Sequence, residues 1–283
     1  MLHYMLSTLR PSPSSARRRH APDFHFCRLF AGDAHALALA RHQHYLCALL
    51  GLRPGMRVLN VGSGAGDAAL ELVRYADVEV VGVDADAEKV QYATRCAREA
   101  GMSSRASFVH ADLEDLSSKL PAESFDAIFA IESLKAAPSF ESIYTPLSRL
   151  LKPGGKIGVV DWCWTPSFSP SDPDHCRLAE ALELAAHLPP RAPSARTMAS
   201  ARAALEDSGL AVRHCEDLGA RADKIAWYAP LEGALADGAS PWLGNARPSA
   251  FGGLSRDAAT VVVQAAKFQL FTPMAVFVAQ KGA

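Results

Sequence analysis

Short apolar runs that alternate with helical patterns constrain the fold of this chain more than any other feature. The runs have the length and composition of buried strands and cover residues 56–61, 78–83, 106–110, 125–131 and 156–162. Helical patterns lie between them, over residues 67–75, 87–100 and 140–151. Strands that alternate with helices predict an α/β fold with a mostly parallel sheet covered by helices on both faces.

The segments on either side of this core are less regular. Residues 33–50 carry a broad apolar stripe that predicts a helix, and Pro153-Gly154-Gly155 predicts a tight turn. Beyond Trp162 we expect two helices and two strands, over residues 174–188, 194–208, 210–216 and 268–280. Residues 220–255 are rich in Gly, Pro and Ala and contain Trp227 and Trp242, and they predict an irregular cap over the site or a flexible loop.

Charge and cysteine content exclude several classes of function. The 283 residues can bury one large core, or one core and a modest cap. The 29 Lys and Arg residues nearly balance the 30 Asp and Glu residues, so no basic face is expected for nucleic-acid binding. Six dispersed cysteines without a CxxC pair predict neither a disulfide framework nor a metal site, and they favour a reducing compartment such as the cytoplasm. No apolar run is long enough for a membrane span.

The N-terminal 23 residues differ from the rest of the chain. They contain Arg10 and the run Arg17-Arg18-Arg19, and no acidic residue precedes Asp23. We expect a flexible tail over residues 1–23, with a mitochondrial transit peptide as the alternative. Pro11 and Pro13 argue against a continuous amphipathic helix there.

A glycine-rich loop follows the first predicted strand. Its sequence is Gly62-Ser63-Gly64-Ala65-Gly66, and a helical pattern begins directly after it. Glycines let the backbone turn sharply and approach a ligand, and a helix N-terminus presents free N–H groups. Dinucleotide folds need GxGxxG spacing, but here Asp67 stands where the last glycine would lie, which disfavours NAD and FAD.

Two acidic residues at strand ends complete this pattern. Asp84 ends the second strand 22 residues after Gly62, where a carboxylate can hold two ribose hydroxyls or can instead cap the following helix. Asp112 follows the third strand and can accept from an adenine amino group or be a turn residue. The loop and Asp84 together favour a cofactor that contains adenosine.

These signals, with Phe125-Asp126-Ala127-Ile128 and Leu150-Leu151-Lys152-Pro153-Gly154-Gly155, resemble the successive motifs of class I S-adenosylmethionine-dependent methyltransferases over residues 51–162. The resemblance implies a class I methyltransferase-like Rossmann fold with S-adenosylmethionine as the cofactor. The residues that it implies for cofactor binding are Asn60, Gly62, Ser63, Gly64, Gly66, Asp84, Asp112 and Ile131.

Further segments are similar to those of sterol C-24 methyltransferases and occur in family order. They are Phe24-His25-Phe26-Cys27-Arg28, residues 40–46, Ala130-Ile131-Glu132, Val160-Asp161-Trp162, Asp172-Pro173-Asp174-His175, residues 216–218, residues 227–231 and residues 270–274. The resemblance implies a seven-stranded sheet whose last strand is antiparallel. It also implies one methyltransferase domain over residues 24–283, with a cofactor-binding half (24–162) and a substrate-binding half with a small C-terminal cap (163–283).

The chain departs from the family at several positions. Residues 15–22 replace the aromatic, glycine-containing segment that lines the sterol site, and the segment between Trp242 and Lys267 is shorter than usual. After Glu132 the family usually has Ala-Thr-Cys-His-Ala-Pro, whereas this chain has Ser133-Leu134-Lys135-Ala136-Ala137-Pro138. Asn60 replaces the family's Asp, and Asp161 stands for the acid of its Tyr-Glu-Trp motif. The cofactor half therefore matches the family more closely than the substrate half.

The candidate catalytic residues are Glu132, Asp161 and His44. Glu132 follows the fourth strand, at the sheet edge where ligands bind, and we expect it to orient the substrate or remove a proton, ahead of Asp161. His42 and His44 lie on opposite sides of a helix, and His44 with Tyr45 could close over the cofactor or lie on the surface. Aromatic candidates for stabilising a cation, or for ordinary core packing, are Phe26, Trp162, Trp164, Trp227 and Tyr228.

The resemblance implies methyl transfer from S-adenosylmethionine to an alkene of a sterol or another isoprenoid lipid. Two alternatives stay open: a small-molecule methyltransferase of specialised metabolism that acts on an O, N or C centre, and a degenerate paralogue without catalysis. The expected partner is a hydrophobic small molecule. We expect a cytoplasmic protein, or one in peripheral contact with the endoplasmic reticulum or lipid droplets. The resemblance suggests the peripheral contact, because such substrates are insoluble in water.

Overall fold

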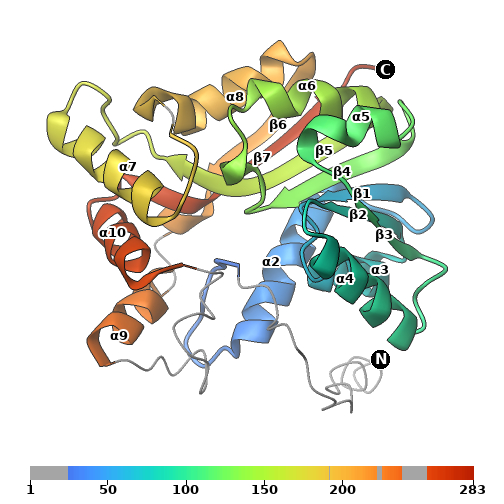
Figure 1. Cartoon of the computed structure of the whole chain (residues 1–283), viewed down its shortest axis with the longest axis horizontal. Coiled ribbons are helices and arrows are strands. Elements are labelled where there is room, and N and C mark those ends of the chain that lie inside the picture. The colour runs from blue at the N-terminus through green and yellow to red at the C-terminus, as the bar shows by residue number, and fades with distance from the viewer. Residues whose placement is uncertain (1–24, 191, 222–224, 238–253) are drawn as a thin grey trace.

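The computed structural model describes residues 25–190, 192–221, 225–237 and 254–283 (Figure 1). The predicted tail over residues 1–23, the expected start of ordered structure at Phe24, and Trp242 lie outside these residues.

One seven-stranded sheet forms the centre of the described structure. Its strands are β1 (Arg57–Val61), β2 (Glu79–Asp84), β3 (Ala106–His110), β4 (Phe125–Ile131), β5 (Leu151–Trp164), β6 (Leu210–Asp217) and β7 (Phe271–Lys281). The strand order is β3-β2-β1-β4-β5-β7-β6, and β7 runs antiparallel to both of its neighbours. This topology confirms the predicted class I methyltransferase fold, including its antiparallel last strand.

The parallel strands end at one common edge of the sheet. Val61 of β1 pairs with Val83 of β2 and with Ala130 of β4, and Ile131 pairs with Val160 of β5. The residues that end or follow these strands therefore meet at this edge. They include the glycine loop, Asp84 and Glu132, which lie far apart in the sequence.

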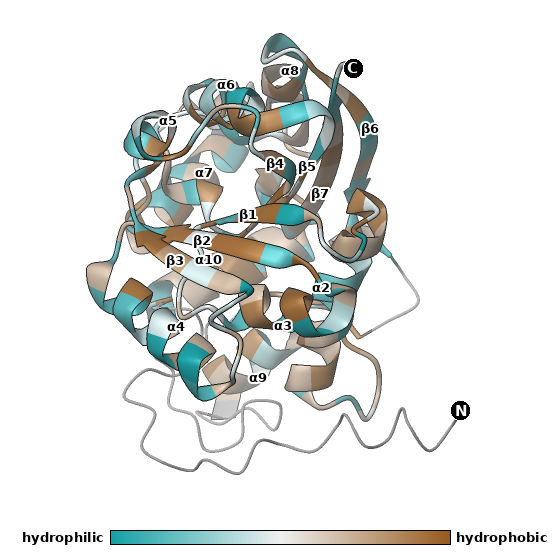
Figure 2. Ribbon diagram, turned by 90° about the vertical axis from the view of Figure 1, so that its right-hand side faces the viewer, coloured by the Kyte–Doolittle hydropathy of each residue, from teal (hydrophilic) through white to brown (hydrophobic). Residues whose placement is uncertain are grey.

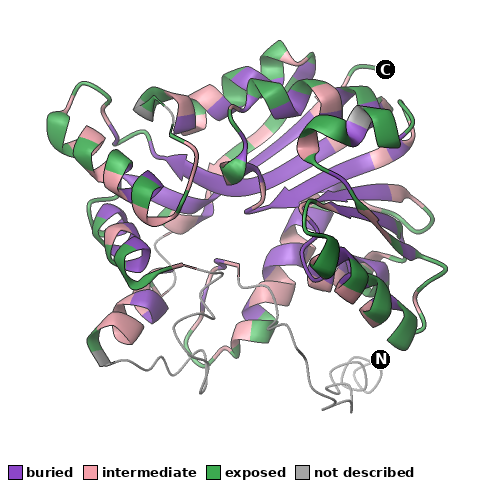
Figure 3. Cartoon of the chain, in the orientation of Figure 1, coloured by how far each residue is buried: buried purple, intermediate pink, exposed green. Residues whose placement is uncertain are grey.

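Helices cover both faces of the sheet. Their bounds are α2 (His35–Leu50), α3 (Asp67–Ala76), α4 (Ala87–Glu99), α5 (Leu116–Lys119), α6 (Glu141–Leu150), α7 (Pro173–Ala185), α8 (Met198–Asp207), α9 (Ala229–Asp237) and α10 (Arg256–Lys267). Figure 1 shows α6 and α8 above the sheet and α2 and α10 below it. The strands between these two layers are buried, whereas the outer helix faces are exposed (Figure 3).

The helices follow from their apolar periodicity. In α3, Ala69, Leu72 and Val73 pack into one core with β1 and β2, and Arg74 points outward. In α6, Ile143 and Leu147 pack into a second core on the opposite face. Figure 2 shows mainly apolar residues along β1 and β2 and hydrophilic ones on the outer turns of α4.

Three expectations for secondary structure were incomplete or wrong. The turn expected at Pro153-Gly154-Gly155 lies within β5 as an irregularity, because Phe125 pairs with Leu151 but Ala127 pairs with Lys156. The expected irregular cap over residues 220–255 contains helix α9. Helix α10 was not predicted, although Ser255 caps it by accepting from the Ala258 N–H group, because its buried face consists mainly of alanine and valine.

Within the described residues, no helix combines the length and the apolar composition that a membrane span requires.

Candidate functional site

The glycine loop lies at the end of β1 and has the backbone geometry that only glycine adopts easily. Gly62, Gly64 and Gly66 all have positive φ angles, of 67°, 53° and 87°. A Cβ atom at Gly62 would overlap the side chain of Ser133, which follows β4. A Cβ at Gly66 would lie 2.9 Å from both Ala93 Cβ and Phe108 Cζ. The loop is therefore packed closely against the segment after β4, against α4 and against β3.

Asp84 joins the end of β2 to this loop. Its Oδ2 accepts a hydrogen bond from the Gly64 N–H group at 2.7 Å, and its Oδ1 accepts from the Asp86 N–H group at 2.9 Å. The cap of the following helix is Asp86, which accepts from the N–H groups of Glu88 and Lys89. Of the two roles considered for Asp84, helix capping is therefore wrong, and the carboxylate faces the glycine loop.

Two polar side chains at the loop are buried without a protein partner. Asn60 Oδ1 on β1 and Ser63 Oγ in the loop make no hydrogen bond with any residue that the structure describes. Buried oxygen atoms of this kind are costly unless a ligand supplies donors. The residues at the end of β1 therefore fit a bound cofactor that carries donor groups.

The two remaining cofactor candidates lie at the ends of β3 and β4. Asp112 is exposed, and its backbone carbonyl accepts from the Asp115 N–H group at the start of a short 3-10 turn. Its carboxylate makes no capping hydrogen bond to this turn, and its exposure leaves it accessible to a ligand. Ile131 is 3% exposed and ends β4, directly before Glu132.

Glu132 is a buried carboxylate with defined partners on both oxygens. Oε1 accepts from the Phe26 N–H group at 2.5 Å, and Oε2 accepts from Trp162 Nε1 at 2.9 Å. The residue has a φ of 51°, and its N–H group donates to the Val160 carbonyl. A left-handed backbone at a buried glutamate is costly and is typical of functional sites.

A lysine accompanies this carboxylate. Lys135 Nζ lies 3.7 Å from Glu132 Oε2, donates to the Glu132 carbonyl at 2.6 Å and lies 4.6 Å from the centre of the Trp162 ring. Burial by itself would raise the pKa of Glu132, but His25, Lys135 and the Trp162 N–H group together lower it. Glu132 is therefore ionised at neutral pH.

Asp161 supports the segment that carries Glu132. Its Oδ2 accepts from the Leu134 N–H group at 2.6 Å, and its Oδ1 accepts from the Trp162 N–H group at 2.7 Å. Burial raises the pKa of Asp161. Arg196, which sequence reasoning missed, donates from Nη1 to the Lys135 carbonyl at 2.8 Å and is 1% exposed. Both side chains hold the backbone immediately after Glu132.

The five aromatic candidates form one connected cluster with Phe271. Phe26 packs edge-on against Trp162 and Trp227, with ring centres 6.1 Å and 5.3 Å apart. Phe271 contacts Trp162 and Trp164, and Tyr228 contacts Trp227. The cluster belongs to the core and also reaches Glu132 through Phe26 and Trp162. These aromatic side chains can therefore pack in the core and also take part in the site.

The structure separates the two histidines of α2. His44 Nε2 lies 2.9 Å from Glu71 Oε1, and its ring stacks on Tyr75 at 3.6 Å, so it joins α2 to α3. His42 instead faces the interior, is 5% exposed and has no described partner at Nε2. Sequence reasoning selected His44 and missed His42. His42 lies on the buried side of α2 with Ala38 and Leu46, four residues away on either side, and the structure is what distinguishes this side from that of His44.

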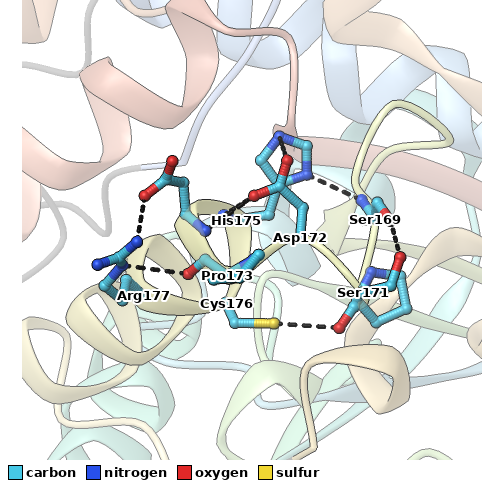
Figure 4. Close-up of polar contacts among 9 residues, drawn as sticks. Ser169, Ser171, Asp172, Pro173, His175, Cys176 and Arg177 are labelled. Carbon is cyan, nitrogen blue, oxygen red and sulfur yellow. Dashed lines mark hydrogen bonds and ion pairs between the residues drawn. The ribbon is translucent and has the colours of Figure 1, made fainter.

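The segment Asp172-Pro173-Asp174-His175 begins helix α7 (Figure 4). Asp172 accepts from the N–H groups of Asp174 and His175, and Pro173 occupies the first turn. His175 Nδ1 accepts from the Ser169 N–H group at 3.0 Å. These contacts show that the segment forms the N-terminus of helix α7. Across the described residues, no group of three or more His, Cys, Asp or Glu side chains is arranged to hold a metal ion.

A family profile described as a methyltransferase domain matches residues 52–211. Sterol 24-C-methyltransferase erg6 of Aspergillus fumigatus is 38% identical over 219 residues, which cover 77% of this chain and 56% of that protein. Sterol 24-C-methyltransferase of Yarrowia lipolytica is 33% identical over an alignment of 285 positions, which covers 91% of this chain and 73% of that protein. The chain thus spans about half to three quarters of the length of these relatives.

Solved structures share the fold at lower sequence identity. Geranyl diphosphate C-methyltransferase from Streptomyces coelicolor A3(2), in complex with Mg²⁺, geranyl-S-thiolodiphosphate and S-adenosyl-L-homocysteine, superposes with a TM-score of 0.71 at 17% identity. The match covers 91% of this chain and 87% of that one. Phosphoethanolamine N-methyltransferase 2 from Haemonchus contortus superposes with a TM-score of 0.64 at 16% identity, over 86% of this chain and 53% of that one.

Proposed function

Because this chain belongs to the methyltransferase-domain family, and within it to the group that contains the fungal sterol 24-C-methyltransferases, we propose that it transfers a methyl group from S-adenosylmethionine to an alkene of a sterol or another isoprenoid lipid. The observation that carries the proposal is Glu132, an ionised carboxylate next to an aromatic cluster and to the glycine loop.

In this proposal the loop edge of the sheet holds the cofactor. Asn60 Oδ1 and Ser63 Oγ accept from its donor groups, and Asp84 accepts from the ribose hydroxyls. Asp112 accepts from the adenine amino group, and the backbone at Gly62, Gly64 and Gly66 with Ile131 lines the site. S-adenosylmethionine, when bound, supplies an electrophilic methyl group on its sulfonium centre. His44 holds α2 against α3, the helix that follows the loop.

Glu132 and the aromatic cluster act on the methyl acceptor. An alkene attacks a sulfonium methyl without prior loss of a proton, so the protein must orient the alkene, shield a positive charge and accept the final proton. Glu132 is the proposed proton acceptor, and the rings of Phe26 and Trp162 face the developing charge. Asp161 and Arg196 keep the segment after Glu132 in place.

One observation favours a second candidate function. The ammonium of Lys135 already lies beside Glu132 and over the Trp162 ring, where a cationic intermediate would be stabilised. A resident cation disfavours a carbocation nearby and instead suits an O, N or C nucleophile that carries negative charge. A small-molecule methyltransferase of specialised metabolism is therefore the alternative to a sterol methyltransferase.

The substrate also bears on location. A sterol or isoprenoid is insoluble in water, so the proposal includes peripheral contact of a cytoplasmic protein with the endoplasmic reticulum or lipid droplets. Localisation of a tagged full-length chain tests this part directly. A mitochondrial signal from the tagged protein would instead support the transit-peptide alternative.

Two measurements on the full-length chain test the proposed activity. Isothermal titration with S-adenosylmethionine should give heat of binding, and its absence would support a degenerate, non-catalytic paralogue. Incubation with sterol and isoprenoid mixtures should then yield a product heavier by one methylene, detected by mass spectrometry. Methylation confined to polar small molecules would overturn the sterol or isoprenoid assignment in favour of the alternative.

A further inference from the structure

A small pocket lies next to the candidate site, between α2, the extended segment of residues 25–30 and the 3-10 turn η4 (Leu218–Ala220). Its volume is about 190 Å³. The lining residues are Arg28, Ala38, Arg41, His42, Tyr45 and Leu218. The polar members of this set are a histidine, a tyrosine and two arginines, and no carboxylate is among them. We propose that this pocket binds an oxyanion, a carboxylate or phosphate group, at the polar end of the methyl acceptor.

His42 is the residue that most directly points to a ligand. It is 5% exposed, lines the pocket, and its Nε2 has no hydrogen-bond partner among the described residues. A buried imidazole nitrogen without a partner is costly, whereas a ligand oxygen would satisfy it. The rigid helix α2, with buried neighbours Ala38 and Leu46 one turn away on either side, holds the ring in place.

Two other polar side chains of the lining, Arg41 and Tyr45, are oriented by carboxylates that are not part of it. Arg41 is paired with Asp33 and donates to the Arg28 carbonyl at 3.2 Å. The Tyr45 hydroxyl lies 3.0 Å from Glu216 Oε2 and 3.1 Å from Arg221 Nη2. The acids thus fix the positions of Arg41 and Tyr45. The Tyr45 hydroxyl donates its one proton to Glu216, so the hydrogen-bond donors in the wall of the pocket are the nitrogen groups of His42 and the two arginines. Such a wall suits an oxygen-rich anion.

Positive charges also crowd this region. Burial, followed by the nearby charge of Arg221, lowers the pKa of Arg28; Glu216 and Tyr45 oppose this shift, and Arg41 reinforces it. An anion in the pocket would reduce this repulsion between like charges. The electrostatics and the orphaned His42 nitrogen therefore favour the same ligand chemistry.

Size and position limit what the acceptor can be. Binding cavities for whole small molecules usually measure about 300 Å³ or more, so this pocket accommodates the end of a ligand and not a sterol ring system. Phe26, which donates to Glu132, is two residues before Arg28, and two extended residues span only about 7 Å. The anionic group would therefore bind close to the reacting end, as in a short isoprenoid acid or phosphate.

This inference rests on the proposed function and is tested by binding rather than turnover. Full-length protein saturated with S-adenosylhomocysteine is titrated calorimetrically with farnesoate, farnesyl phosphate and farnesol, which share one hydrocarbon chain. We expect at least one of the two anions to bind about tenfold more tightly than the alcohol, because hydrogen bonds to a charged group are stronger than those to a neutral hydroxyl. Equal affinity for farnesol and both anions would overturn the inference.

Variants of His42 test whether the preference for the anion depends on this residue. His42→Phe keeps the ring volume but removes the nitrogen, so the preference for the anion should fall by about tenfold, and His42→Gln, which retains a donor, should restore part of it. His187→Asn is the control, because His187 is exposed, lies outside the pocket lining and has a φ of 52° that asparagine tolerates.

The outcomes separate the two proposals. If His42→Phe leaves the preference for the anion intact, or weakens only S-adenosylmethionine binding, the pocket is not the acceptor's oxyanion site. If the anion binds in a manner sensitive to His42→Phe but no acceptor is methylated, the pocket assignment holds and the proposed function fails.

Discussion

At the scale of single residues, Glu132 combines three unusual properties. It is buried, it has a left-handed backbone, and it accepts one hydrogen bond on each carboxylate oxygen from residues distant in sequence. Burying a charged carboxylate on a strained backbone costs folding free energy. The position of Glu132 directly after β4 and next to the glycine loop indicates that this free energy is spent on a functional site.

Replacing Glu132 by glutamine should separate catalysis from cofactor binding. The amide keeps one acceptor oxygen, so either the Phe26 or the Trp162 N–H group loses its acceptor, and the free energy of unfolding should fall by about 1–3 kcal/mol. Loss of a general base should reduce turnover by about 10²–10⁴-fold. Calorimetric affinity for S-adenosylmethionine should not change.

Glu99→Gln provides the matched control, because Glu99 is exposed at the end of α4. It should alter neither stability nor turnover. Normal turnover of Glu132→Gln would remove Glu132 from the catalytic role.

His42 makes a prediction about acid stability. Burial lowers the pKa of His42 to about 4, with Glu132 opposing the shift and His25 and Arg28 reinforcing it. Its unfolded value is near 6.5, so its contribution to stability is complete above that pH and is lost as the pH falls through about 4. This loss amounts to about 3 kcal/mol.

Urea denaturation at neutral pH and at about pH 4 measures this effect. In His42→Phe the decrease in unfolding free energy should be smaller than in the wild type by about that amount. His187→Asn should retain the wild-type decrease, because His187 is exposed. An unchanged decrease in His42→Phe would show that another group titrates in this range.

At the scale of elements, the glycine loop depends on its contact with the segment after β4. Gly62→Ala introduces a Cβ that overlaps Ser133 and a φ of 67° that alanine adopts only with strain. Gly101→Ala is the matched control, since Gly101 has a φ of 70° but no atom within 4 Å of the new Cβ. Both variants carry backbone strain, and the Gly62 variant alone adds the overlap.

Chemical denaturation should therefore show Gly62→Ala to be less stable than Gly101→Ala by about 1–3 kcal/mol. Affinity for S-adenosylmethionine should fall only in Gly62→Ala, because the loop must move away from Ser133. The double variant Gly62→Ala/Ser133→Gly removes the overlapping group and should recover part of the loss. Equal stability of the two alanine variants would contradict the close packing of loop and β4.

Across the whole molecule, the C-terminal strands complete the sheet of the N-terminal half. β7 lies between β5 and β6 and pairs with both, so neither half has a complete sheet by itself. Arg196 adds a second link, because it contacts Glu183 of α7 and the carbonyl of Lys135 behind Glu132. The two halves should therefore unfold together.

Arg196→Met should test this coupling. The side chain of Arg196 is 1% exposed, and its guanidinium contacts Glu183 and the Lys135 carbonyl in the core. Its removal leaves the buried carboxylate of Glu183 without this partner and should lower the free energy of unfolding by about 3–5 kcal/mol. Arg202→Met, which breaks an exposed pair with Glu206, should cost less than about 1 kcal/mol. In differential scanning calorimetry the single transition should shift as a whole, and a split into two transitions would contradict one cooperative domain.

Several features of the site could be predicted from the sequence, and others could not. The positions of Gly62, Asp84 and Glu132 at the sheet edge were predictable, because each ends or directly follows a recognisable strand. The histidine on α2 that faces the interior was not, because choosing His42 over His44 requires knowing which side of the helix packs on the sheet. Helix α10 was missed because small residues form most of its buried face and give a weak apolar signal.

Local sequence patterns are sufficient to predict the alternation of strands and helices, the glycine loop and the acids at the strand ends, because these signals depend on residues only a few positions apart. Which side chains contact one another depends on the folded arrangement. Phe26 and Glu132 are 106 positions apart, and Arg196 reaches Lys135 across 61 positions. Such contacts depend on how whole helices and strands pack, and no local pattern in the chain encodes that packing.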